Sequence, residues 1–78
     1  MVHIIRILDA INSDITTIAF SNSEKKKAIS TWIKIIDDVE KETGVEGIVT
    51  NTETGSRVNF EGKEYIFDSV PSGTELVN

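Results

Sequence analysis

The chain has 78 residues, no cysteine and one histidine, and its 13 acidic and 8 basic residues give a formal charge of −5. This length suits one domain, and without cysteine the chain has no disulfide scaffold of the kind that stabilises small secreted proteins. The acidic balance argues against nucleic acid as a partner, because phosphate binding requires clustered lysine and arginine.

The N-terminal segment is predicted to form a β-hairpin. Residues 2–8 are β-branched and apolar on both faces, which favours a central strand. The same apolar residues also recur at helical spacing, so a helix over residues 2–11 is the alternative. Turn-forming residues 12–14 follow, and the alternating pattern of residues 15–20 is typical of a second strand.

A long amphipathic helix comes next. Ser21 and Glu24 have the spacing of a capping box, with Ser23 as the alternative N-cap. We expect the helix to end near Thr43, because Gly44 supplies the left-handed residue that commonly follows a helix.

The apolar face of this helix is centred on Trp32, which we expect to pack against the sheet. Ile33 and Ile35 lie at its two margins and make the apolar arc wider than a core-facing helix needs. We interpret the extra width as the sign of a curved sheet that wraps the helix. The alternative is an exposed margin that contacts a partner.

Three further strands are predicted after the helix. Residues 45–52, 57–60 and 63–67 follow a period of two, with a turn at 52–55 and a two-residue hairpin turn at 61–62. The predicted fold class is α+β, an antiparallel sheet in ββαβββ order with the helix packed across one face. We expect one domain over residues 1–70 and a flexible tail over residues 71–78.

Catalysis is not indicated. His3 is the only histidine, and a structural or solvent-facing role suits it better than that of a general base. Acidic residues gather at the end of the predicted helix, where a solvated surface is the simpler interpretation than a metal site. We therefore predict no enzyme activity, no cofactor and no metal.

The helix charges run against the helix dipole. Residues 25–27 are lysines at the positive N-terminal end, whereas acidic residues occupy the negative C-terminal end. Such an arrangement costs a few tenths of a kcal/mol for each exposed charge. One interpretation is that the helix has a charged partner, which is either a second copy of the chain or a different, basic protein. The alternative is neutral drift on a surface where such small costs are tolerated.

We therefore predict a small non-catalytic protein-binding module, an acidic inhibitor or regulator that occludes a site on a larger intracellular protein. In size, acidity and element order the chain resembles the small inhibitors and regulators that phages and mobile elements encode. The alternative is a self-associating structural or accessory protein that forms a homodimer through a sheet edge or the helix margin. The candidate partner-binding residues are Lys34, Asp37, Asp38 and Lys41 on the helix, and Arg57, Asn59 and Glu64 on the last hairpin.

The N-terminal apolar run is too short for a signal peptide or a membrane span, so we expect a cytoplasmic protein with no membrane contact.

Overall fold

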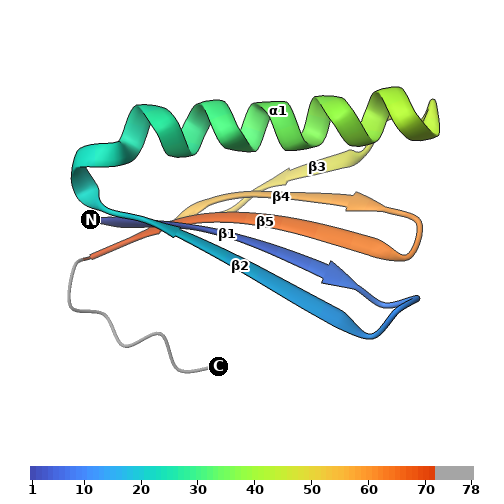
Figure 1. Cartoon of the computed structure of the whole chain (residues 1–78), viewed down its shortest axis with the longest axis horizontal. Helices are drawn as coiled ribbons and strands as arrows, with labels where there is room; N and C mark the ends of the chain where they lie inside the picture. The colour runs from blue at the N-terminus through green and yellow to red at the C-terminus, as the bar shows by residue number, and fades with distance from the viewer. Residues whose placement is uncertain (72–78) are drawn as a thin grey trace.

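A computed structural model describes residues 1–71 and places five strands and one long helix in the predicted ββαβββ order. The strands are β1 (Val2–Asp9), β2 (Asp14–Phe20), β3 (Ile48–Asn51), β4 (Gly55–Phe60) and β5 (Lys63–Val70). A 3-10 turn, η1 (Asn22–Glu24), leads into the helix α1 (Lys25–Thr43). All strand pairs are antiparallel, in the order β2-β1-β5-β4-β3, and α1 runs along one face of the open sheet (Figure 1). The predicted α+β class is confirmed, whereas all of the predicted tail except Pro71 lies outside the described residues.

The first strand, β1, is central, as its composition predicts. It lies between β2 and β5. Ile4 and Ile5 point to opposite faces of the sheet, and they are 2% and 0% exposed respectively. Burial on both faces explains the continuous apolar run, and the helical alternative for residues 2–11 is wrong.

The turn between β1 and β2 is held by Asp9. Its carboxylate accepts hydrogen bonds from the backbone N–H groups of Ile11 and Asn12 and, at 2.8 Å, from the Asn12 side-chain amide. The hydrogen bonds from Asn12 hold the pKa of Asp9 below its usual range, and the bond from the Asn12 side chain has the largest effect. A charged Asp9 therefore fixes the start of the hairpin.

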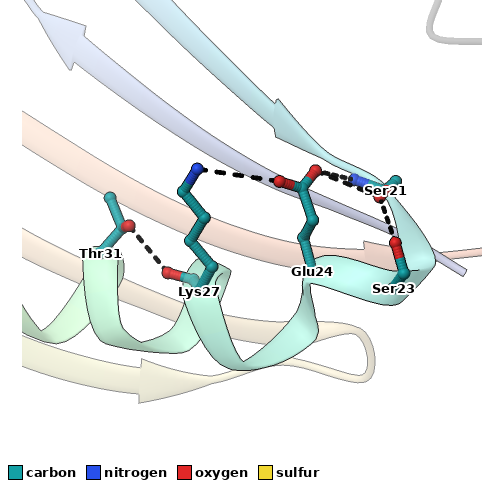
Figure 2. A network of polar contacts seen from close by, with 5 residues as sticks. All are labelled: Ser21, Ser23, Glu24, Lys27 and Thr31. Carbon is teal, nitrogen blue, oxygen red and sulfur yellow. Dashed lines mark hydrogen bonds and ion pairs between the residues drawn. The ribbon is translucent and has the colours of Figure 1, made fainter.

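The predicted capping box is present at the start of the helical segment (Figure 2). The Glu24 carboxylate accepts hydrogen bonds from the Ser21 backbone N–H at 3.2 Å and from the Ser21 hydroxyl at 3.1 Å. These two bonds lower the pKa of Glu24, and Lys27 lies 3.8 Å from the same carboxylate. At the other end Gly44 is left-handed, with φ of 69°, and its N–H donates to the Glu40 carbonyl.

The core between α1 and the sheet is small. Ile5, Phe20 and Ala28 form its buried cluster, and Trp32 packs against them as predicted. The Trp32 ring stacks on Phe67 with 5.7 Å between ring centroids. Few side chains therefore carry most of the apolar burial.

The third strand is shorter than predicted and begins at Ile48 instead of Val45. The chain between Gly44 and Ile48 is tied to the end of the helix, because the Glu40 carboxylate accepts a hydrogen bond from the Gly47 N–H. Gly47 also lies close to the β4 side chains: a Cβ atom there would come within 2.8 Å of the Phe60 ring. These contacts delay the start of regular strand pairing.

The last two strands have the predicted register. Phe60 pairs with Lys63, and Val58 pairs with Tyr65 across the hairpin. Val58 and Tyr65 are both 3% exposed and face the helix side. Gly62 has a φ of 78°, which a residue with a side chain rarely adopts and which suits the glycine predicted in this turn.

His3 has a structural role in this fold. It is 2% exposed, and its Nδ1 atom lies 2.7 Å from the Ser69 hydroxyl oxygen across the β1–β5 pair. Its Nε2 atom has no hydrogen-bond partner within residues 1–71. Ser69 is therefore the residue that provides the hydrogen bond to the buried imidazole ring of His3.

Replacing Ser69 by alanine is expected to lower the free energy of unfolding by about 1–3 kcal/mol, because it leaves a buried imidazole without its partner. Urea unfolding monitored by circular dichroism measures the change. Ser30→Ala, at an exposed helix position, is the matched control and should change stability by less than about 0.5 kcal/mol. Equal unfolding midpoints for the two variants would show that the Ser69 contact contributes nothing.

Candidate protein-binding surfaces

The predicted partner-binding residues lie on two opposite sides of the molecule. Lys34, Asp37, Asp38 and Lys41 are exposed on α1, whereas the residues from the last hairpin lie on β4 and β5. The strand register puts Arg57, Asn59 and Glu64 on the sheet face that points away from the helix. The two groups therefore cannot contact one flat partner surface together.

The two charged residues of the sheet-face group, Arg57 and Glu64, pair with each other. Arg57 on β4 and Glu64 on β5 form an ion pair with 2.9 Å between Nε and Oε1. Asn59 lies directly opposite Glu64 in the same strand pair. Because the two charges already compensate each other, this face offers a partner little net charge to recognise.

The four candidate residues on α1 do not all lie on the same side of the helix. At 100° per residue, Asp37 lies next to Ile33 on the side of α1 that faces β3 and β4, whereas Asp38 is turned toward the opposite side. Two adjoining hollows meet at Asp37, and neither is lined by Lys34 or Asp38. Of the four predicted helix residues, Asp37 and Lys41 line these two hollows.

The first hollow, named here the helix groove, lies between α1 and the strands β3 and β4. It has a volume of about 180 Å³. Its lining is mostly apolar and consists of Trp32, Ile33, Ile36, Asp37, Val49, Ser56 and Val58. Ile33 is 54% exposed and Val49 is 63% exposed, so a large part of this apolar surface is open to solvent.

The groove exists because one helix is too narrow for five strands. Strands lie about 4.8 Å apart and a helix with its side chains is about 10–12 Å wide, so one helix covers about two strands. The helix α1 packs closest to β1 and β2. Within residues 1–71 no second helix covers β3 and β4.

The exposure of Ile33 corrects one interpretation of the sequence. Ile35 packs against the core cluster, as a sheet that wraps the helix would require. Ile33 at the other margin is 54% exposed, so the sheet leaves it open to solvent. The excess width of the apolar arc is therefore an exposed margin on the β3 side.

The second hollow, named here the acidic hollow, adjoins the groove at the C-terminal end of α1. It has a volume of about 330 Å³ and is lined by Asp37, Glu40, Lys41, Gly44, Val45 and Glu46. Three carboxylates and one ammonium group give it a net negative charge. The reversed charge pattern of the helix therefore puts acidic side chains beside the apolar groove.

A third hollow lies where the end of α1 faces the two hairpin turns. It has a volume of about 380 Å³ and is lined by Ile11, Thr43, Val45, Phe60 and Glu61. Glu61 is its only charged residue. It is the largest of the hollows but offers few groups that would distinguish one apolar ligand from another.

Three further observations concern metal binding, membrane-spanning helices and similarity to known proteins. In the described part of the chain, no group of three histidine, cysteine, aspartate or glutamate residues is placed to hold a metal ion. No helix of residues 1–71 is long and apolar enough to cross a membrane. No protein-family model, curated protein or solved structure matches the chain.

Proposed function

We propose that this chain is a non-catalytic protein-binding module that inhibits or regulates a larger intracellular protein by holding a basic amphipathic helix of that protein in the helix groove. The observation that supports this proposal is the position of an open apolar groove directly beside an acidic hollow. An exposed apolar surface with a polar rim is typical of a protein-binding site.

The shape and charge of the helix groove favour a basic amphipathic helix as the bound segment. Ile33, Ile36 and Val49 offer an apolar surface to the apolar stripe of a helix, which is a recurring mode of peptide recognition. Lysine or arginine residues on the flank of that helix would face Asp37 and the acidic hollow. The overall charge of −5 would speed the encounter with a basic partner.

A charge reversal at Asp37 is expected to weaken binding of a basic amphipathic helix about tenfold, which corresponds to about 1.4 kcal/mol. The probe is a synthetic helical peptide of alternating leucine and lysine pairs. Trp32 lines the groove and is the only tryptophan, so its fluorescence reports binding directly.

Asp38→Lys is the matched control for Asp37→Lys, because it makes the same charge change one residue away on the other side of the helix. It should leave the affinity for the peptide within about twofold of the unmodified chain. A peptide with glutamate in place of lysine should bind at least tenfold more weakly. Equal affinities for the two variants, or for the two peptides, would rule out the groove and its acidic neighbour as the binding site.

A further inference from the structure

The outer edge of β2 is the longest strand edge that the described residues leave unpaired. Within residues 1–71, β2 pairs only with β1, and it lies at the end of the sheet. Natural edge strands are usually kept from pairing by lysine, proline, a bulge or a covering loop. The strand Asp14–Phe20 has the sequence DITTIAF, with one charge and neither lysine nor proline.

The hydrogen-bond ladder shows which backbone groups point outward. The Ala10 N–H donates to the Gly62 carbonyl at 3.0 Å, one step beyond the last β1–β5 pair, so even-numbered residues of β1 point their backbone groups toward β5. Odd-numbered residues of β1 then point toward β2, where they pair with even-numbered residues. The outward N–H and C=O groups of β2 therefore belong to Ile15, Thr17 and Ala19. In agreement, the Ile15 N–H is bound by the neighbouring Asp14 carboxylate and not by β1.

We propose that β2 pairs antiparallel with β2 of a second copy of this chain, around a two-fold axis at Thr17. In this register Thr17 lies opposite Thr17 of the second copy, and Ile15 lies opposite Ala19. In the dimer each of the three outward residues donates one hydrogen bond and accepts one, which gives six backbone hydrogen bonds across the axis. The Ile15 N–H exchanges its bond to the Asp14 carboxylate for one to the second strand. A shift of the register by two residues would leave an outward group of Ile15 or Ala19 without a strand partner.

The side chains suit this register. Thr17 faces Thr17 on the sheet face away from the helix, and threonine pairs of this kind are favourable across antiparallel strands. The single charge, Asp14, lies opposite Phe20 and not opposite its own copy. No pair of like charges opposes the contact.

The helix charges suit it as well. A two-fold axis perpendicular to the sheet puts both helices on the same face and makes them antiparallel. The start of α1 lies near β1 and β2, on the side of the sheet where the second copy pairs. The lysine end of one helix therefore points in the same direction as the acidic end of the other, and no like-charged helix ends are aligned.

The edge of β3 is a poorer site for the same contact. It has only four residues. The same alternation leaves only Val49 and Asn51 of this strand pointing outward, whereas β2 offers three outward residues. The second copy is therefore assigned to β2, on the side of the molecule away from the helix groove.

Cysteine cross-linking tests the assignment, because the chain has no cysteine of its own. Opposed residues that share hydrogen bonds across antiparallel strands have Cα atoms about 5.5 Å apart, within the range of about 4.4–6.8 Å that a disulfide spans. With oxidised glutathione as the oxidant, Thr17→Cys should form a covalent dimer at concentrations that leave Thr50→Cys monomeric. Thr50 is the matched control, since it is an exposed threonine on the same sheet face in the other edge strand.

Two measurements keep the proposal open to refutation. Light scattering on the unmodified chain should show the mass rising from 8.6 kDa toward twice that value as concentration increases. Thr16→Cys should cross-link at least fivefold more slowly than Thr17→Cys, because Thr16 lies opposite Ile18 in this register. A monomer at millimolar concentration, equal cross-linking of the Thr17 and Thr50 variants, or faster cross-linking at Thr16 would each overturn the proposal.

Discussion

Replacing Gly55 by alanine is expected to unfold most of the protein at room temperature. A Cβ atom at Gly55 would overlap the carbonyl oxygen of Phe67 and lie 2.8 Å from the carbonyl carbon of the same residue. Both atoms belong to the backbone of β5, so no side-chain rotation can relieve the overlap. The strands β4 and β5 would have to move apart where Gly55 pairs with Asp68.

The expected loss of stability is large relative to what the fold has. Overpacking in a closely packed region costs about 1–3 kcal/mol when side chains can adjust, and here the backbone must move. Separation of the strands would also break the hydrogen bond from the Ser69 N–H to the Thr54 carbonyl and the one from the Thr54 hydroxyl to Asp68. A domain of this size has a net stability of only about 3–5 kcal/mol. Circular dichroism should therefore show that Gly55→Ala loses most of its sheet signal.

Gly44→Ala is the control for this prediction. Gly44 is the left-handed residue after the helix, but a Cβ atom there would meet nothing within 4 Å. Its replacement should cost only the backbone strain of about 1–2 kcal/mol. The prediction fails if Gly55→Ala is as stable as Gly44→Ala in urea.

Local patterns in the sequence were enough to identify the elements. The boundaries of α1 follow from capping residues on either side of it. The strand β1 follows from a continuous run of β-branched apolar residues, and the other strands follow from alternation along a few neighbouring residues. The hairpin of β4 and β5 was predicted to the register, since a two-residue turn fixes which residues face each other. These features depend only on residues that are close in the chain.

The pairing of β1 with β5 could not be read from such patterns. It joins residues 66 positions apart, as His3 and Ser69 show. Without that pairing Ser69 resembles the start of a polar tail, whereas in the structure it belongs to β5 and binds a buried histidine. The strand order β2-β1-β5-β4-β3 has the same origin.

The helix groove was predicted only in part. Asp37 was expected to bind a partner and Ile33 to lie at a margin, because both follow from the helical repeat. The β-strand side of the groove, Val49 and Val58, could not be predicted, since the sequence does not say over which strands the helix lies. The same missing information explains why Lys34 and Asp38 were grouped with Asp37 although they lie away from the groove.

Ile5→Ala is expected to lower the free energy of unfolding by about 2–5 kcal/mol, which is close to the whole stability of a domain of this size. Ile5 is fully buried at the centre of the sheet, between Ile18 on β2 and Phe67 on β5, and it belongs to the small cluster with Phe20 and Ala28. Its neighbours are held in the same packed cluster, so the atoms that the substitution removes leave a cavity among them.

Ile15→Ala is the control for this variant, because Ile15 loses the same atoms at a strand position that is 70% exposed. It should change stability by less than about 0.5 kcal/mol in dilute protein. Urea unfolding of both variants measures the difference. A loss of less than 1 kcal/mol for Ile5→Ala would show that the interior can close around the missing atoms.

The concentration dependence of the Ile5→Ala variant connects its stability to the proposed contact between copies. Only folded chains present a formed β2 edge, so pairing of two copies stabilises the folded state by mass action. The unfolding midpoint of Ile5→Ala should therefore rise with protein concentration, and it should no longer rise when Thr17→Pro removes an outward N–H at the two-fold axis. The substitution by proline removes no hydrogen bond between β1 and β2, because the Thr17 N–H points away from β1. A midpoint that is independent of concentration without the proline would mean that the small core alone holds this fold together.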